Sequence, residues 1–451
     1  MALTKSVPFT FPLSQTGAHM KISRGHMAKP DIARMMAVTL ITDVMENAKL
    51  LSDLTFGPKF LSLSPPERAR AQRLATECLR GVERADRILS AFLQKKPPLR
   101  IMNILRLATF ELSTGGDAHG VVNDAVTLAA MDKKHAMFKG LVNAVLRKVA
   151  KSGPEQWPKL RAARIPIWLR GPLKAAYGGE VISAIERVQS NTPPVDLTPK
   201  NPEKLQELAS LVGGEIILGQ SVRLKSPGQI SKIDGYDKGE WWVQDAAAAL
   251  PVRLLGNIRG KTALDLCAAP GGKTLQLAAA GAEVTAVDIS ERRLKRLEEN
   301  LQRTGMTAEV KAMDAFALRD VHYDVIVLDA PCSATGTLRR HPDLPYAKDG
   351  SEFANLIQLQ QKMLRHAVNL LAPGGRLVYC TCSLLPDEGE AQIEDLISEN
   401  TLITVDTATL LHTHIDPTWV VDGLGLRLRP DYLAEQGGMD GFFVSLLHKK
   451  V

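Results

Sequence analysis

The sequence is poor in cysteine and aromatic residues, and it has no long apolar run. Five cysteines in 451 residues are too few for a disulfide-stapled fold, and the odd number suits a reducing compartment. No stretch of about 18 apolar residues occurs, so the sequence predicts no transmembrane helix. Aromatic residues make up only 5% of the chain, yet 45% of it is hydrophobic, which excludes a wholly disordered protein. We therefore expect a cytoplasmic globular protein of about two to four domains.

The whole chain has a formal net charge of +7, and acidic residues are scarce in two of its segments. Residues 1–30 contain four Lys and Arg and no acid, and we expect them to form a basic flexible arm. The run from Arg147 to Lys174 contains eight basic residues and one acid, with tryptophans between them. Cations with interleaved aromatic rings suit phosphates and stacked bases, although a solvated linker with its tryptophans packed inward is the alternative. The predicted RNA contacts here are Lys148, Lys151, Arg161, Arg164, Arg170 and Lys174.

The periodicity of apolar residues divides the rest of the chain. Residues 31–150 show helical spacing throughout and predict a compact helical bundle, followed by a basic linker over 151–190. Residues 191–240 mix short strand-like pieces with one helix and predict a small α+β connector. From 241 to 451, short apolar runs alternate with helical segments, which is typical of a mostly parallel sheet covered on both faces. The expected strands are 263–266, 284–289, 310–313, 325–328 and 377–379.

The first of these strands ends in a glycine-rich run, Asp-Leu-Cys-Ala-Ala-Pro-Gly-Gly-Lys-Thr, at residues 265–274. Its glycines permit close approach of a ligand, and the next helix offers free backbone N–H groups. The run nearly matches a phosphate-binding loop, but Cys267 stands where the first glycine belongs. A P-loop ATPase is therefore one interpretation, and a nucleoside-binding enzyme is the other.

Acidic residues at the other strand ends favour the second interpretation. Asp288 ends the second strand, where a carboxylate can bind both ribose hydroxyls or merely cap the next helix. Asp314 follows the third strand, in a place suited to an adenine edge, and Asp329 ends the fourth. Acids repel the phosphates of ATP and attract the sulfonium cation of S-adenosylmethionine, so charge favours a methyl donor.

Two cysteines follow neighbouring strands, Cys332 after the fourth and Cys382 after the fifth. They are either small buried residues or nucleophiles; the Cys380-x-Cys382 spacing alternates across a strand and suits no metal. A thiolate added to C6 of cytosine turns the ring into an enamine whose C5 can accept a methyl group. Asp329 would supply a proton at N3, and Lys273 or a helix N-terminus would lower the thiol pKa. The residues alone do not decide which cysteine attacks.

Several motifs resemble those of the NOL1/NOP2/Sun family of RNA cytosine-C5 methyltransferases. They are residues 265–274, Asp-Ala-Pro-Cys-Ser-Ala-Thr-Gly (329–336), Arg-Arg-His-Pro-Asp (339–343), Thr-Cys-Ser (381–383), Val-Gln-Asp-Ala (243–246) and Asp-Gly-Phe-Phe (440–443). The helical segment 31–150 is similar to the NusB RNA-binding domain, and the combination resembles the bacterial members that act on 16S rRNA. Residues 196–200 depart from the family pattern.

The resemblance implies a Rossmann-type methyltransferase domain preceded by an all-α NusB-like domain and a small RRM-like connector. It implies Cys382 as the nucleophile and Cys332 as the cysteine that assists release, with Asp329 between cofactor and base. It also implies that the cofactor, S-adenosylmethionine, is bound by Cys267, Ala268, Ala269, Pro270, Gly271, Gly272, Lys273, Asp288, Asp314 and Asp329. We add Arg339 and Arg340 to the predicted RNA contacts.

We therefore predict a monomeric, cytoplasmic enzyme that methylates C5 of a cytosine in unassembled or partly assembled small-subunit rRNA, without a metal and without a membrane partner. The alternatives are a tRNA-directed member of the same family, a P-loop ATPase, and a non-catalytic NusB-like RNA-binding protein. The target base must leave its stack to reach the cysteine, which is easiest in a loop or bulge.

Overall fold

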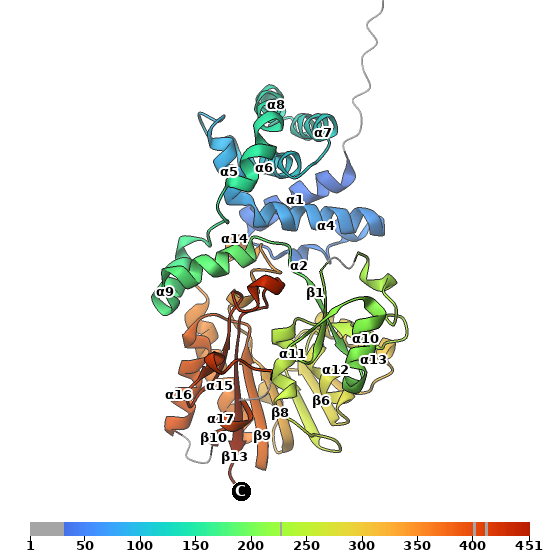
Figure 1. Ribbon diagram of the computed structural model, residues 1–451, viewed down its shortest axis with the longest axis vertical. Coiled ribbons are helices and arrows are strands. Elements are labelled where there is room, and N and C mark those ends of the chain that lie inside the picture. The colour runs from blue at the N-terminus through green and yellow to red at the C-terminus, as the bar shows by residue number, and fades with distance from the viewer. Residues whose placement is uncertain (1–30, 226–227, 400–402, 411–413) are drawn as a thin grey trace, which may run out of the picture.

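A computed structural model describes residues 31–225, 228–399, 403–410 and 414–451. The basic arm expected over residues 1–30 lies outside these ranges. No helix within them is both long and apolar enough to cross a bilayer. Figure 1 shows a helical domain above a domain built on a large sheet, with one long helix between them.

The helical domain begins where Asp31 caps the first helix by accepting a hydrogen bond from the backbone N–H of Arg34, at 3.0 Å. Ser64 and Glu67 form a capping box before the next long helix, whose first residue is Pro65. Ile41, Leu105 and Leu146 lie in its buried core. Its helices are α1 (Ile32–Asn47), α2 (Leu51–Leu54), α3 (Pro58–Leu61), α4 (Pro65–Arg80), α5 (Val82–Ser90), α6 (Leu99–Ser113), α7 (Ala118–Met131) and α8 (Lys139–Gln156).

The segment expected as a basic linker is mostly helical. Helix α8 continues to Gln156, and α9 covers Ile167–Gln189 with a kink at Gly178, whose φ is 81°. Leu169 and Ile185 of α9 pack against Leu384 of the catalytic domain. Pro172 and the kinked Gly178 lie inside α9 and interrupt the helical pattern in the sequence.

The connector is a four-stranded antiparallel sheet in the order β2-β3-β1-β4 (Glu215–Ile217, Ser221–Leu224, Val195–Pro199 and Trp241–Val243), with α10 (Leu205–Val212). It extends past the boundary expected at residue 240. Asp196, in the run that departs from the family pattern, is buried and forms an ion pair with the buried Arg223 at 2.7 Å. Asp196 also accepts a hydrogen bond from the backbone of Ala246, so this run joins the connector to the catalytic domain.

The larger sheet has the order β11-β12-β13-β9-β8-β5-β6-β7, and β10 pairs with β13. Strands β5 (Thr262–Leu266), β6 (Glu283–Asp288), β7 (Glu309–Ala312), β8 (Tyr323–Asp329) and β9 (Leu371–Thr381) are parallel and match the five predicted strands, two of which were expected to end one residue later. The antiparallel strands β10 (Ile403–Val405), β11 (Val420–Val421), β12 (Gly425–Leu428) and β13 (Phe442–Lys449) were not predicted.

Alternate residues of the central strands face opposite layers. Val325 and Val327 pack in the cluster that includes Leu250 of α11, whereas Ile326 and Leu328 pack in the cluster that includes Leu364 of α15. The helices of this domain are α11 (Ala246–Arg253), α12 (Gly272–Ala279), α13 (Glu291–Thr304), α14 (Leu344–Ala347), α15 (Phe353–Asn369), α16 (Glu390–Glu399) and α17 (Thr407–Leu410). The predicted Rossmann-type domain, preceded by an all-α domain and an α+β connector, is confirmed.

The helical domain is attached to the segment that follows Cys332. Asp343 accepts a hydrogen bond from the backbone N–H of Leu51 at 2.8 Å, and Arg80 donates one to the carbonyl of Arg339 at 2.7 Å. Tyr346 packs against the core of the helical domain. The same segment of chain therefore borders the strand ends and carries the helical domain.

Candidate active site

The strand order creates a crevice at the carboxyl ends of β5 and β8. These two strands are neighbours, but the chain leaves β5 toward β6 and β7 on one side and leaves β8 toward β9 on the other. Such a topological switch point is where open parallel sheets bind ligands. The loop after β5, Asp288 at the end of β6, Asp329 at the end of β8 and the cysteines after β8 and β9 all lie at this edge.

The loop after β5 is shaped by its glycines and fastened to β6. Gly271 has a φ of 109°, and a Cβ atom there would lie 2.4 Å from Leu297, so no side chain fits. The backbone N–H of Ala269 donates to Asp288 at 3.2 Å. The loop leads directly into α12, whose first N–H groups face the crevice. This is the predicted cofactor loop, and it forms a compact cradle.

Asp265 fixes the base of this loop. It is fully buried and accepts a hydrogen bond from the hydroxyl of Thr274 at 2.6 Å, while its second oxygen has no partner among the described residues. Burial is the largest effect on this carboxyl and raises its pKa to about 7. Asp265 is therefore protonated over a wider pH range than an ordinary aspartate.

Asp288 is buried at the end of β6 and faces the cofactor loop. It accepts hydrogen bonds from the backbone of Ser290 at 2.8 Å and from the Arg293 side chain at 2.9 Å. The cap of α13 is Ser290 rather than Asp288, so the simple capping role considered from the sequence does not apply. The next residue, Ile289, is 75% exposed beside it. The sequence analysis missed this apolar surface, which a planar ring could cover.

Asp314 is farther from the crevice. It follows β7, is exposed, and accepts a hydrogen bond from the backbone of Phe316 at 2.9 Å, which caps a short 3-10 helix. A contact between Asp314 and the cofactor remains a prediction.

Lys273 and Asp329 form an ion pair across the crevice. The ammonium of Lys273 donates to Asp329 Oδ2 at 2.7 Å, and the thiol of Cys380 lies 3.7 Å from Oδ1. Burial is the largest single effect and would lower the pKa of Lys273, but the charge and hydrogen bond of Asp329, together with the nearby Cys380 and Asp265, outweigh it, so the net shift is upward. Lys273 therefore pairs with Asp329. Its charge acts to lower the pKa of Cys380, where burial outweighs it, and among the described residues it makes no contact with Cys332 or Cys382.

Cys332 and Cys382 are brought together. Their sulfur atoms lie 3.4 Å apart and both residues are half-buried. The hydrogen bond with Cys382, followed by burial, raises the pKa of Cys332 well above that of a free cysteine. Burial likewise raises the pKa of Cys380, which lies inside the sheet. Cys332 is thus held as a thiol next to Cys382.

A buried polar network that the sequence analysis missed holds the two cysteine-bearing loops in register. Glu388, fully buried, accepts hydrogen bonds from the backbone of Ser333 at 2.9 Å and from Gln360 at 3.0 Å. The hydroxyls of Ser333 and Ser383 lie 3.2 Å apart. Glu388 is 50 or more residues from its partners in the loop after β8, so local spacing carries no signal for it.

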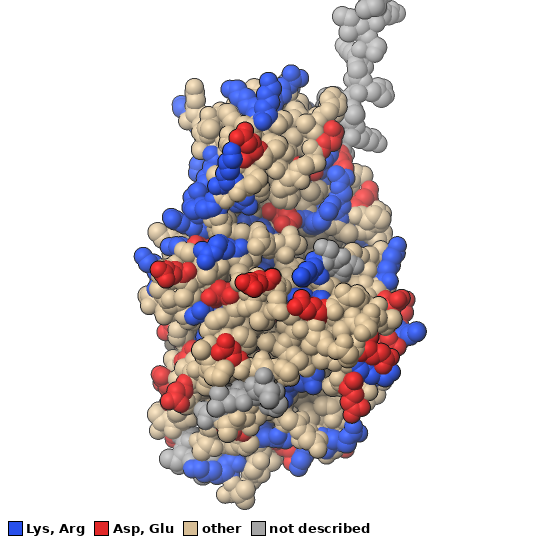
Figure 2. Space-filling view, viewed as in Figure 1, with Lys and Arg blue, Asp and Glu red and all other residues tan. Residues whose placement is uncertain are grey.

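The predicted RNA contacts divide into two groups. Lys148, Lys151, Arg164 and Lys174 are exposed. Arg161 is paired with Glu83, and Arg170 donates to Glu186 at 2.7 Å. In Figure 2, Lys and Arg side chains gather on the upper part of the molecule, over the helical domain.

Arg339 does not belong to an RNA surface. It is 1% exposed and pairs with Asp245 and Asp440, so its predicted RNA contact is wrong. Arg340 is tied to Asp440 at 2.7 Å but keeps part of its side chain exposed. The tryptophans of the basic stretch are also packed: Trp157 is buried against Phe110, as the alternative interpretation held.

Within the described residues, no group of three or more His, Cys, Asp or Glu side chains is arranged to hold a metal ion. A Rossmann sheet of this order, with a glycine cradle, strand-end acids and two adjacent cysteines, defines a Rossmann-type methyltransferase.

Comparison with known proteins places the chain more closely. Residues 252–448 match the family model for 16S rRNA methyltransferase RsmB/F, and residues 31–151 match that of the NusB family. The chain is 32% identical to ribosomal RNA small subunit methyltransferase B of Photorhabdus laumondii, over 92% of this chain and 98% of that protein. The equivalent protein of Cronobacter sakazakii is 31% identical over 94% of this chain and its entire length. The crystal structure of PH0851 has the same fold, with a TM-score of 0.71 and 21% identity over 94% of this chain and 99% of that one.

The chain belongs to the 16S rRNA methyltransferase RsmB/F family. The family resemblance noted in the sequence is thereby confirmed, and the protein is a methyltransferase rather than a P-loop ATPase or a non-catalytic RNA-binding protein.

Proposed function

We propose that the protein uses S-adenosylmethionine to methylate C5 of a cytosine in 16S rRNA, through a covalent bond between Cys382 and C6 of the base. The observation that carries the proposal is the pair of sulfur atoms 3.4 Å apart beside the Lys273–Asp329 ion pair, at the switch point of the sheet. A methyltransferase that acted on an exocyclic nitrogen or a ribose hydroxyl would need no such pair of cysteines.

The residues around the crevice fit the cofactor. S-adenosylmethionine supplies an electrophilic methyl group on a sulfonium cation. The cradle of residues 267–272 and the N-terminus of α12 would hold its polar end, and Asp288 would accept hydrogen bonds from the ribose. Exposed Ile289 would cover the adenine ring.

The two cysteines take different roles because their environments differ. Cys332 is held as a thiol whose sulfur lies 3.4 Å from that of Cys382, which leaves Cys382 as the cysteine that attacks the base. In the addition step, Cys382 Sγ bonds to C6 and a proton passes to N3 from the Asp329–Lys273 pair. C5 then takes the methyl group. As the bond from Cys382 to C6 breaks, Cys332 passes its thiol proton to Cys382 Sγ and takes up the C5 proton in its place, and N3 returns its proton to the Asp329–Lys273 pair.

The substrate is inferred from the relatives and from the exposed cations. The curated relatives are named as small-subunit rRNA methyltransferases. The exposed residues Lys148, Lys151, Arg164 and Lys174 extend from the helical domain toward the catalytic domain and suit an RNA backbone. We expect a monomer acting in the cytoplasm on rRNA that is not yet fully assembled.

Methyl transfer to isolated RNA tests this function. The purified protein is incubated with methyl-labelled S-adenosylmethionine and either 16S rRNA or bulk tRNA from cells that lack the gene. The RNA is then digested and its nucleosides separated by mass spectrometry. We expect label in 5-methylcytidine from 16S rRNA alone. Label in any other nucleoside would refute the chemistry, and label in tRNA alone would refute the substrate.

A further inference from the structure

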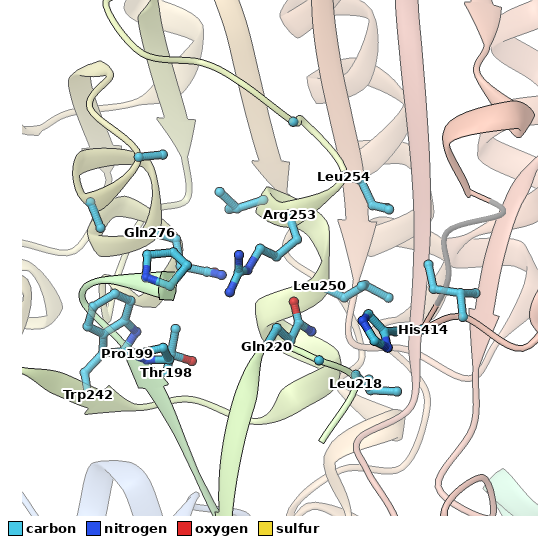
Figure 3. A pocket seen from close by; sticks show the side chains of 17 residues that line it. Thr198, Pro199, Leu218, Gln220, Trp242, Leu250, Arg253, Leu254, Gln276 and His414 are labelled. Carbon is cyan, nitrogen blue, oxygen red and sulfur yellow. The ribbon is translucent and has the colours of Figure 1, made fainter. Parts of the chain in front are cut away.

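A second concave site lies between the connector and the catalytic domain. It is a pocket of about 420 Å³ lined by the end of β1, the turn between β2 and β3, helix α11, the end of α12, and residues 414–415 (Figure 3). Its volume is in the range of small-molecule sites.

The pocket is separate from the crevice at the strand ends. Helix α12 begins at Gly272 in the cofactor loop, and the pocket is lined by Ala279 and Ala280 at the opposite end of this helix. Eight residues of helix span roughly 12 Å. A ligand in the pocket would therefore not overlap one held in the cofactor cradle.

Arg253, at the end of α11, is the only Lys or Arg in the wall, and no Asp or Glu lines the pocket. It is half-buried, and its guanidinium has no hydrogen bond or ion pair with any residue that the structure describes. Burial lowers the pKa of Arg253, because the cation is partly removed from water and no anionic partner replaces the lost hydration. Half-buried charges of this kind are normally paired.

The two neighbouring amide side chains already have hydrogen-bond partners, whereas the buried hydroxyl of Thr198 has none among the described residues and can join the guanidinium in binding an anion. Gln276 uses both ends of its amide, accepting from Gln244 at 2.8 Å and donating to the Ala249 carbonyl at 2.8 Å. The amide nitrogen of Gln220 donates to Ala246 at 3.0 Å. Figure 3 shows the Arg253 guanidinium pointing into the space between Gln276 and Gln220.

Apart from Thr198, Gln220, Gln276 and His414, the rest of the wall is apolar or glycine. Leu218, Trp242, Leu250 and Leu254 line the pocket around the Arg253 guanidinium. This combination selects a molecule with an anionic head and an apolar body, since each part then meets its complement.

We propose that this pocket binds a small organic anion, whose phosphate or carboxylate head pairs with Arg253 and whose apolar body packs against Leu250 and Trp242. The proposal does not depend on the identity of the methylated nucleotide.

Isothermal titration of the full-length protein with phenyl phosphate tests the site. We expect saturable binding to one site, and weaker binding of inorganic phosphate, which has no apolar body. Arg253→Met should weaken the binding of phenyl phosphate about 10- to 100-fold, and Arg253→Lys should weaken it less, because it keeps the charge but loses the planar fork. The matched control is Arg319→Met, a change of an exposed arginine outside the pocket, which should bind phenyl phosphate as the unchanged protein does.

A variant that fills the pocket separates binding from folding. Ala279→Leu keeps Arg253 and should also abolish binding, while circular dichroism and the urea unfolding midpoint report whether each variant is folded. The proposal is overturned if phenyl phosphate does not bind, if folded Arg253→Met binds it equally well, or if S-adenosylmethionine displaces it. It is also overturned if Arg253→Met weakens the binding of an RNA oligonucleotide but not that of phenyl phosphate. The anion that pairs with Arg253 would then be an RNA phosphate.

Discussion

The two ends of the chain use charge differently. Between residues 31 and 190, 25 Lys and Arg stand against 15 Asp and Glu, whereas between residues 191 and 451, 27 stand against 34. In the first region several cations are exposed, and Lys148 and Lys174 are examples. In the second, Arg223 and Arg339 are buried in ion pairs. The exposed lysines of the helical region are available to a polyanion, while the buried Arg223 and Arg339 hold the connector and the catalytic domain together.

The largest contrast is expected at the cysteines. Cys382→Ala should lower methyl transfer by about 10³-fold or more, because the nucleophile is lost. The same substitution at Cys78, in the core of the helical domain, should leave methyl transfer nearly unchanged and cost only some stability. Initial rates with saturating S-adenosylmethionine measure both. Undiminished methyl transfer by Cys382→Ala would refute its role.

A second contrast concerns stability. Arg339→Met leaves the buried Asp245 without its cation and leaves Asp440 with Arg340 alone, and we expect the free energy of unfolding to fall by about 3–5 kcal/mol. Urea unfolding measures this loss, and Arg319→Met at an exposed position provides the matched control. If Arg339→Met were as stable as the unchanged protein, these ion pairs would not contribute to the free energy of unfolding.

A third test uses pH. The pKa of Asp265 is raised by burial to about 7, so between about pH 4 and 7 the folded state keeps a proton that the unfolded state has lost. Stability from this group is therefore greatest below pH 4 and falls as pH rises to 7, by on the order of 4 kcal/mol. Asp265→Asn should remove this component from the pH profile of urea unfolding.

Asp314→Asn, a change at an exposed aspartate, is the control for that profile. It should leave the pH dependence between 4 and 7 as it is in the unchanged protein. Identical profiles for Asp265→Asn and the unchanged protein would contradict the environment assigned to Asp265.

The smallest effect is expected at the RNA surface. Replacing Lys148, Lys151, Arg164 and Lys174 with Gln should reduce the slope of log affinity against log salt concentration by about three units without affecting stability. Filter binding of a 16S rRNA fragment at several salt concentrations measures the slope. Arg161→Gln and Arg170→Gln together form the control, because their charges are already paired. If both multiple variants lost the same amount of slope, the exposed and the paired basic residues would not differ in their contribution to RNA binding.

Local patterns sufficed for much of the fold. The helix over residues 99–113 and the strands that carry Asp288 and Asp329 follow from apolar spacing and turn residues, and so does the meeting of their ends at one edge. Helix α9 was not predicted, because Pro172 and Gly178 within it are residues typical of a linker.

Long-range pairing was beyond this kind of reasoning. Arg339 meets Asp245, which is 94 residues away, and Asp440, which is about as far in the other direction, so its sequence neighbours gave no sign of burial. The same holds for the partners of Glu388 and for the free guanidinium of Arg253, which depend on how the connector packs against the catalytic domain.

Covalent capture of the RNA tests the central claim most directly. Cys332→Ala is incubated with 16S rRNA and S-adenosylmethionine, separated on a denaturing gel, and digested for peptide mapping by mass spectrometry. Without the thiol that removes the C5 proton, the adduct should accumulate, with the nucleotide attached to Cys382. The assignment would be contradicted if the Cys382→Ala protein captured RNA through Cys332 and the Cys332→Ala protein captured no RNA.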